Sequence, residues 1–295
     1  MGPRLPEWLR KPQTAFVALH EIKRNLRTLG LETVCESARC PNIHECFARG
    51  TATFLILGNR CTRRCGFCAV PKAQQERLPP PDADEPLMVA RMAAEMRLRH
   101  VVVTSVTRDD LPDGGAGHFA GVISALRAAL PDARIEVLTP DFHGDPQALA
   151  RVLEAGPHIF NHNLETVRRL YPRVRPQAGY ERSLEVLAFA ARYRPELLTK
   201  SGFMVGLGER PEEVRQLLYD LRQAGVQIVT VGQYLQPTRR NLAVAEYVSP
   251  AQFEAYRELG LALGFRTVLS GPFVRSSYLA EELARQCVGL GEKRP

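Results

Sequence analysis

The sequence lacks any apolar run of the ~18 residues that a membrane-spanning helix requires. It also lacks an apolar run after its N-terminal charges, which argues against a secretory signal. The net charge is +7, but no basic run reaches the ~5–6 like charges that mark an interaction tail. These absences predict a cytoplasmic protein that binds neither membranes nor nucleic acids.

Compositional bias is absent as well. Hydrophobic residues make up 45% of the chain and charged residues 24%, close to the averages of globular proteins, which excludes wholesale disorder and collagen-like repeats. A chain of 295 residues does not need disulfides to stabilise its core. It nevertheless has seven cysteines, six of which lie between Cys35 and Cys68. Clustered thiols in a large chain indicate metal or redox chemistry in a reducing compartment.

Short apolar strands alternate with amphipathic helices from about residue 53 onward. The predicted strands span residues 53–57, 100–106, 134–139, 158–163, 197–205 and 227–235. The predicted helices between them span residues 85–99, 118–130, 146–155, 181–193 and 211–224, with further helices at 14–29 and 250–263 and a strand at 266–269. Repeated strand-helix units predict an α/β fold with a parallel sheet, either open or curled into a barrel. Six units are too few for a complete eightfold barrel.

The six clustered cysteines form two triplets. One has the spacing C-x3-C-x2-C and directly follows the first predicted strand, at the carboxyl end where α/β folds place their sites; it consists of Cys61, Cys65 and Cys68. The other has the spacing C-x4-C-x5-C and consists of Cys35, Cys40 and Cys46. Three thiolates on a loop suit a 4Fe-4S cluster and leave one of its irons for another ligand. Two triplets therefore indicate two clusters, each with an open corner.

Two other interpretations of the cysteines stay open. The second triplet together with His44 would make one tetrahedral zinc centre, although neither triplet has the paired C-x2-C spacing usual for zinc. The other interpretation is that some of the six are ordinary buried thiols, but two regular spacings beside Pro41 and Gly66 favour a ligand role. The seventh cysteine, Cys287, stands apart and has no assigned role.

The segment Cys61-Thr-Arg-Arg-Cys65-Gly-Phe-Cys68 resembles the cluster-binding motif of the radical S-adenosylmethionine (SAM) superfamily. The segment Cys35-Glu-Ser-Ala-Arg-Cys40-Pro-Asn-Ile-His-Glu-Cys46 is similar to the auxiliary-cluster motif of the lipoyl synthase family. Other stretches similar to that family are residues 50–58, 104–111, 161–166, 199–209, 232–238 and 275–278. The resemblance runs from about residue 6 to residue 280.

The resemblance implies an enzyme that inserts two sulfur atoms, at carbon 6 and carbon 8, into an octanoyl chain amide-linked to a lysine of a lipoyl carrier protein. It implies two 4Fe-4S clusters, SAM and an external electron donor, with the auxiliary cluster as the sulfur donor. The implied fold is a partial (β/α)6 TIM-type barrel over residues 53–235. An N-terminal extension, 1–52, carries the auxiliary-cluster cysteines, and a C-terminal extension, 236–295, carries an Arg-Ser-Ser-Tyr motif, all within one structural domain.

The resemblance also implies residue roles. The first cluster is bound by Cys61, Cys65 and Cys68. The auxiliary cluster is bound by Cys35, Cys40 and Cys46, with Ser277 as its fourth ligand. A serine alkoxide is a harder and weaker ligand for iron than a thiolate, so its corner should open readily as the cluster is dismantled.

Five residues are candidate contacts of SAM: Thr104, Ser105, Asn163, Glu165 and Lys200. Ordinary structural roles compete with most of these assignments. Hydrogen bonding at a strand end would explain Thr104 and Ser105, a buried amide network would explain Asn163, and an ion pair would explain Lys200.

Two other functions are compatible with the residues alone. One is a different two-cluster radical enzyme whose second cluster transfers electrons and is not consumed. The other is a non-catalytic zinc or iron-sulfur protein that binds nucleic acid through its arginines, but the scattered basic residues form no aromatic-basic stripe. The sequence departs from the family pattern at Gln177, Asn241 and Leu279, none of which is an implied cluster ligand.

Overall fold

A curved eight-stranded sheet forms the centre of the computed structural model, which describes residues 5–10, 24, 26–48, 53–74, 77–278, 280 and 282. The strands are β1 (Glu32–Thr33), β2 (Thr53–Ile56), β3 (His100–Ser105), β4 (Arg134–Leu138), β5 (Ile159–Asn161), β6 (Leu198–Val205), β7 (Ile228–Gln233) and β8 (Thr267–Gly271). They lie side by side in chain order. β1 pairs antiparallel with β2, and all later neighbours are parallel.

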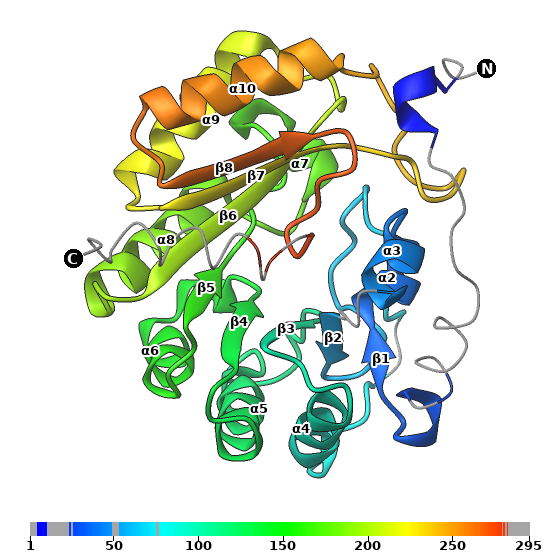
Figure 1. Cartoon of the computed structure of the whole chain (residues 1–295), viewed down its shortest axis with the longest axis vertical. Coiled ribbons are helices and arrows are strands. Elements are labelled where there is room, and N and C mark those ends of the chain that lie inside the picture. Colours follow the sequence, from blue (N-terminus) through cyan, green and yellow to red (C-terminus); the bar gives the residue numbers. More distant parts are fainter. Residues whose placement is uncertain are drawn as a thin grey trace.

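Helices pack along the outer, convex side of the sheet (Figure 1). The helices that follow the parallel strands are α4 (Glu85–Glu95), α5 (Ala116–Ala129), α6 (Pro146–Glu154), α8 (Tyr180–Tyr193), α9 (Pro211–Gln223) and α10 (Pro250–Ala262). The shorter ones are α2 (Val34–Ser37), α3 (Ile43–Ala48), α7 (Tyr171–Val174) and the 3-10 turns η1 (Glu7–Leu9), η2 (Phe142–Gly144) and η3 (Arg168–Leu170). None of the helices described is long and apolar enough to cross a membrane.

Local sequence explains where these helices begin and end. Asp145 caps α6, because its side chain accepts a hydrogen bond from the Gln147 amide at 2.9 Å, and Pro146 occupies the first turn, where no amide is needed. α4 ends at Glu95 and does not reach residue 99 as predicted, since Arg97 adopts the left-handed conformation at φ 50°. The helix predicted at 14–29 lies largely outside the described residues.

The expectation of an α/β fold with a partial, open barrel is confirmed. The strand predicted near residue 266 adds to the sheet, since β8 pairs in parallel with β7 and gives seven parallel strands in place of six. Within the described residues no pairing joins β8 back to β2, so the sheet stays open. The open side is covered by β1, α2 and α3, and the segment after β8 turns back toward the same side (Figure 1).

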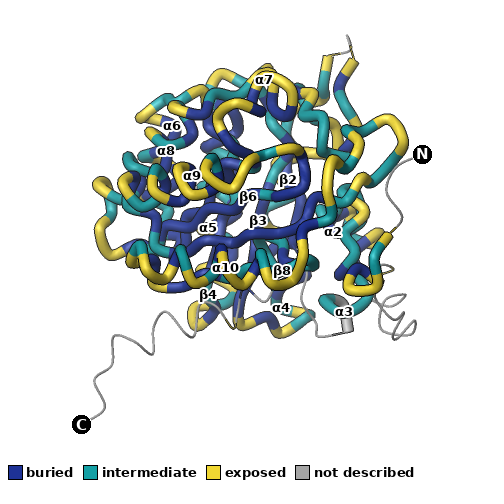
Figure 2. Tube along the Cα trace, turned by 90° about the horizontal axis from the view of Figure 1, so that it is seen from above, coloured by how far each residue is buried: buried dark blue, intermediate teal, exposed yellow. Residues whose placement is uncertain are grey.

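Most residues of β2–β7 are buried, and the exposed residues lie mainly on the outer helices and loops (Figure 2). One apolar cluster packs β2–β5 against α4–α6, and a second packs β6–β8 against α8–α10. Apolar burial on this scale is the main favourable term for folding. The sheet also buries an ion pair, Lys200 with Glu136 at 2.8 Å, each side chain 1% exposed.

Candidate active site

The carboxyl ends of the parallel strands surround a cavity of about 500 Å3, here called the central cavity. Its lining includes five of the six clustered cysteines and both serines of the C-terminal motif: Cys35, Cys40, Cys61, Cys65, Cys68, Ser276 and Ser277. Cys46 does not line the cavity, but its charge acts on the Cys35 thiol, which places the two near each other. Groups far apart in the sequence thus meet around one space.

The loop of the first triplet, residues 61–68, is braced by the chain around it. The Gly66 amide donates to the Val174 carbonyl at 2.9 Å, and the Cys61 amide donates to the Pro71 carbonyl at 2.9 Å. A Cβ at Gly66 would lie 2.9 Å from Leu242 Cγ and 3.3 Å from the Arg173 carbonyl. The glycine therefore permits close packing that a larger residue would disturb.

Two of the departures from the family pattern contact this same loop. Gln177 accepts a hydrogen bond from the Arg64 amide at 2.6 Å through Oε1. Asn241 donates through Nδ2 to the Gly66 carbonyl at 3.2 Å and to the Cys68 carbonyl at 3.1 Å. Both side chains hydrogen-bond to the backbone between the cysteines. The sequence alone gave no reason to expect these contacts. The third departure, Leu279, lies outside the described residues.

Hydrogen bonds join the segment of the second triplet to the segment that carries the C-terminal motif. Asn42, between Cys40 and Cys46, donates through Nδ2 to the Phe273 carbonyl at 2.7 Å. The Tyr278 hydroxyl donates to Glu45 Oε1 at 2.9 Å. These bonds, here called the clasp, hold the segment that carries Ser277 against the segment that carries the cysteines.

The thiols lie in an environment that suits ligation to a metal cluster. Burial raises the pKa of Cys35 to about 12 and the pKa of Cys65 to about 11, and it also raises the pKa of Cys68. Buried thiols of this kind stay protonated unless a cationic centre displaces the proton. One carboxylate, that of Glu165, lines the cavity. Four cationic side chains line it as well: Arg39, Lys72, Arg175 and Arg275. This balance favours an anionic occupant.

Zinc receives no support from the geometry. Among the described residues, no three His, Cys, Asp or Glu side chains are grouped so that they could hold one metal ion. In a 4Fe-4S cluster each cysteine binds a different iron, so thiols spread around a cavity suit it better than they suit a single ion.

Three buried oxygens at the central cavity have no hydrogen-bond donor within the described part of the chain: Ser105 Oγ, Thr139 Oγ1 and Asn163 Oδ1. A buried acceptor without a donor costs about 1–3 kcal/mol. An ammonium group and ribose hydroxyls would supply donors, so these residues fit SAM. Thr139 was not among the predicted residues; its only sequence signal is its place at the end of a strand.

Thr104 and Glu165 also line the cavity but already have partners. The Thr104 hydroxyl donates to the Leu138 carbonyl at 2.9 Å, which leaves its lone pairs for a ligand. Glu165 accepts from Asn163 Nδ2 at 3.0 Å, and burial raises the pKa of this carboxyl. Its backbone is left-handed at φ 68°, a conformation that costs a non-glycine residue about 1–3 kcal/mol and is often found at functional sites.

Lys200 does not line the central cavity. Its ammonium lies inside the sheet against Glu136, which also contacts His100 Nε2 at 3.2 Å and accepts from Asn161 at 3.2 Å. Burial alone would raise the pKa of Glu136, but Lys200 and His100 outweigh it and hold that pKa at about 2. The structure thus places Lys200 in the ion pair that competed with its assignment as a SAM contact.

Arg175, which was not predicted from the sequence, lines the cavity and is 9% exposed. Its Nη1 donates to the Asn163 carbonyl at 2.7 Å and to the Tyr171 hydroxyl at 3.1 Å. Its Nε has no acceptor among the described residues. A fixed guanidinium with a free donor suits a carboxylate. The surrounding Pro and Arg residues resemble an exposed basic loop, so no local signal marked this position.

Comparison with known proteins identifies relatives over nearly the whole chain. The profile of the Radical SAM superfamily matches residues 55–221. The lipoyl synthase of Rubrobacter xylanophilus is 55% identical over 94% of this chain and 85% of its own length. That of Caldanaerobacter subterraneus is 54% identical over 95% of this chain and 97% of its own.

Solved structures with low sequence identity share the fold. Methylornithine synthase superposes with a TM-score of 0.57 at 16% identity, covering 94% of this chain and 97% of its own. A maturase of FeFe-hydrogenase superposes with a TM-score of 0.57 at 14% identity, covering 92% of this chain and 66% of its own. At such identities the likeness concerns the fold alone.

Proposed function

This chain belongs to the lipoyl synthase family of radical SAM enzymes, and on that premise we propose that it inserts sulfur at carbon 6 and carbon 8 of an octanoyl chain. The substrate is the octanoyl amide of a lysine on a lipoyl carrier protein, and the product is the lipoyl group. The observation that carries this proposal is the central cavity, where cysteines of both triplets and Ser277 meet. A long acyl chain inserted there would lie between the proposed source of the radical, at the first triplet, and the proposed source of sulfur, at the second triplet.

Each proposed cluster has its own set of residues. The first, which binds SAM, is held by Cys61, Cys65 and Cys68. The auxiliary cluster is held by Cys35, Cys40, Cys46 and Ser277. When bound, the first cluster with SAM supplies a radical that removes hydrogen from unactivated carbon, and the auxiliary cluster supplies the sulfur.

The other polar residues of the central cavity bind and orient SAM in this proposal. Ser105, Thr139 and Asn163 accept hydrogen bonds from the ammonium and ribose hydroxyls of SAM, as their unpaired oxygens suggest. Arg175 donates to the carboxylate through its free Nε. Asn163 also donates to Ser276 Oγ at 2.6 Å, which links the proposed SAM site to the segment carrying Ser277.

Thr104, on β3, and Glu165, in the loop after β5, complete the proposed SAM site. The buried wall of the cavity keeps water from the reacting carbon. An external protein supplies the electrons, and the reducing interior of the cell preserves the free thiols.

Iron and sulfide analysis tests the cluster assignment. Anaerobically prepared protein should contain about eight irons per chain. Replacing the second triplet by alanine should lower this to about four, whereas Cys287→Ala, a cysteine without an assigned role, should leave it unchanged. A value near four that the triplet variant does not alter would contradict the assignment.

Mass spectrometry of an octanoylated carrier peptide tests the reaction. With SAM and a reductant, the product should gain two sulfur atoms, and the auxiliary cluster should be lost during the first turnover. An auxiliary cluster recovered intact after product forms would favour an electron-transfer role. Ser277→Ala should abolish the two-sulfur product, whereas Ser276→Ala, which loses the bond from Asn163, should lower its yield without abolishing it.

A further inference from the structure

A series of buried hydrogen bonds beside the central cavity joins two residues of the proposed SAM site. Arg175 Nη1 donates to the Tyr171 hydroxyl, on α7, at 3.1 Å. That hydroxyl lies 3.3 Å from Ser183 Oγ, on α8, which in turn lies 3.1 Å from His162 Nε2. His162 follows β5, and its Nδ1 lies 2.9 Å from the Thr139 carbonyl oxygen. Tyr171, Ser183 and His162 are here called the relay. It connects Arg175 at one end to Thr139 at the other.

The relay is closed to solvent. Ser183 is buried, Tyr171 is 4% exposed and His162 is 1% exposed. Of these three residues His162 alone lines the cavity, and both of its ring nitrogens already face partners within the protein. A ring engaged in this way offers a ligand neither a donor nor an acceptor. The relay therefore acts on the cavity through the residues at its ends.

The two ends fix the direction of each hydrogen bond in the relay. The Arg175 guanidinium can only donate, so the Tyr171 hydroxyl accepts from it and turns its own proton toward Ser183. The Thr139 carbonyl can only accept, so the ring proton of His162 is assigned to Nδ1. Nε2 is then the acceptor for the Ser183 hydroxyl. Each donor has one acceptor, and this pattern requires a single tautomer of a neutral imidazole.

His162 is neutral at neutral pH, as this pattern requires. Burial lowers the pKa of His162 to about 4, and the charges of Arg175 and Arg63 act in the same direction. The Asp141 carboxylate acts in the opposite direction but does not outweigh them. An imidazolium would present two donors and leave the Ser183 proton without its acceptor.

Each end of the relay presents a polar atom to be paired. At one end Arg175 Nε is buried without an acceptor among the described residues, while Nη1 is engaged by the relay and by the Asn163 carbonyl at 2.7 Å. At the other end Thr139 Oγ1 is buried without a donor in the same part of the chain. The Thr139 backbone is held on both sides, since its amide donates to the Asn161 carbonyl at 2.9 Å and its carbonyl accepts from the relay.

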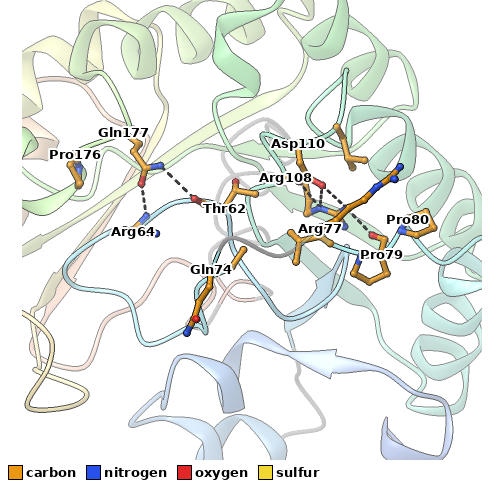
Figure 3. A pocket seen from close by; sticks show the side chains of 13 residues that line it. Thr62, Arg64, Gln74, Arg77, Pro79, Pro80, Arg108, Asp110, Pro176 and Gln177 are labelled. Carbon is orange, nitrogen blue, oxygen red and sulfur yellow. Dashed lines mark hydrogen bonds and ion pairs between the residues drawn. The ribbon is translucent and has the colours of Figure 1, made fainter.

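The backbone that follows Arg175 is held separately from its side chain. Two residues further on, Gln177 accepts from the Arg64 amide at 2.6 Å and donates to the Thr62 carbonyl at 3.4 Å (Figure 3). These bonds attach the segment after α7 to the loop of the first triplet. They do not reach the guanidinium of Arg175, whose direction is set by the Asn163 carbonyl and the relay.

We propose that His162 and Ser183 are positioning residues for SAM. Through the relay they hold the Arg175 guanidinium ready for the SAM carboxylate, and they hold Thr139 for a second polar group of the same ligand. A relay with one direction and one tautomer has one low-energy arrangement, so both contacts are in place before SAM binds. This inference rests on the proposed function, because it assigns the central cavity to SAM.

Binding of SAM and of decarboxylated SAM distinguishes this role from a general loosening of the structure. Decarboxylated SAM lacks the group that Arg175 would bind but keeps the ammonium, the sulfonium and the ribose. Equilibrium dialysis with the oxidised, anaerobic holoenzyme gives both Kd values. Ser183→Ala cuts the relay on the side of Arg175, so it should raise the Kd of SAM about three- to tenfold and that of decarboxylated SAM less than about twofold.

Two substitutions of His162 test the two ends of the relay separately. In His162→Asn the shorter amide places a donor near the position of Nδ1 and leaves Ser183 without a partner, so this variant should behave like Ser183→Ala. In His162→Gln the longer amide places an acceptor near the position of Nε2 and leaves the Thr139 carbonyl without its donor. This variant should weaken SAM and decarboxylated SAM by similar factors.

Thr199→Val is the matched control. It removes a buried hydroxyl that donates to the Gly225 carbonyl at 2.8 Å and does not line the cavity, and it should leave both Kd values unchanged. Tyr171→Phe removes the acceptor of Arg175 Nη1 and should give the same result as Ser183→Ala. It takes the place of Ser183→Ala if that variant binds less iron than the wild type.

Two results would overturn the inference. One is a wild-type Kd of SAM in both Ser183→Ala and Tyr171→Phe. The other is an equal weakening of SAM and decarboxylated SAM in these two variants, which would reduce the effect to a general loosening. The measurements do not use the lipoyl product, so a protein that shows the expected Kd values but makes no two-sulfur product would refute the proposed function alone.

Discussion

Replacing Lys200 by methionine tests the buried ion pair inside the sheet. Glu136 would lose its partner at 2.8 Å while staying 1% exposed. At an effective dielectric constant of about 20, a pair at that distance interacts by about 6 kcal/mol. His100 and Asn161 still contact the carboxylate and recover part of this. We therefore expect Lys200→Met to lower the free energy of unfolding by about 3–5 kcal/mol at neutral pH.

The pH dependence of this loss has a definite sign. In the wild type the folded pKa of Glu136 is about 2, below its ordinary value of 4.5, so its contribution is present above 4.5 and is lost as pH falls toward 2. Without Lys200, the largest cause that lowers this pKa is gone, while burial, which raises it, remains, so we expect the folded pKa to rise. A raised carboxyl pKa gives stability at low pH that is lost as pH rises. The difference between variant and wild type should therefore widen as pH increases.

Urea unfolding of anaerobically prepared protein, followed by far-UV circular dichroism between about pH 3 and pH 7, measures both effects. Lys200→Met with Glu136→Gln removes both charges and should recover at least half of the lost stability. A loss below about 1 kcal/mol, or a loss that does not change with pH, would refute the reasoning. Weaker SAM binding without loss of stability would instead return Lys200 to the SAM site.

Two further predictions concern the segment near Ser277. A Cβ at Gly202 would lie 2.5 Å from Thr230 Oγ1, 2.9 Å from Ser276 Oγ and 3.0 Å from Asn163 Oδ1. Gly202→Ala should therefore cost about 1–3 kcal/mol and weaken SAM binding in equilibrium dialysis. Gly121→Ala, where the Cβ meets only an ordinary contact at 3.6 Å, is the control, and equal affinities would contradict the packing argument. Tyr278→Phe removes the hydroxyl that donates to Glu45 and should cost about 0.5–1.5 kcal/mol, with faster loss of auxiliary-cluster iron to a chelator; an unchanged rate would show that this part of the clasp does not retain the cluster.

The alternation of strands and helices was predictable from sequence because buried parallel strands form continuous apolar runs, which the helix period then interrupts. Helix ends were predictable where a cap was present, as at Asp145. The predicted end was wrong where the backbone becomes left-handed at a residue other than glycine, as at Arg97. The pairing of β8 with β7 depends on contacts far apart in the sequence, which periodicity does not specify.

The cysteines were predictable as a group because their spacing is local. Arg175 and Thr139 were not, since each becomes part of the cavity only through folding. Lys200 illustrates the opposite case. A lysine at a strand near the expected site suggested a SAM contact, yet its partner, Glu136, comes from β4, and only the structure shows that the two meet at 2.8 Å.

The two proposed cluster sites differ in how the surrounding chain holds the segments that carry their ligands. The first lies on a loop whose backbone is held by Val174, Gln177 and Asn241 through bonds that do not involve the thiols. In the second, the bonds of the clasp connect segments that lie 231 and 233 positions apart in the chain. At about 0.5–1.5 kcal/mol per net hydrogen bond, the clasp can position the serine ligand but contributes little resistance to its departure. A site of this kind suits a cluster that is dismantled and replaced, whereas the braced loop suits one that is kept.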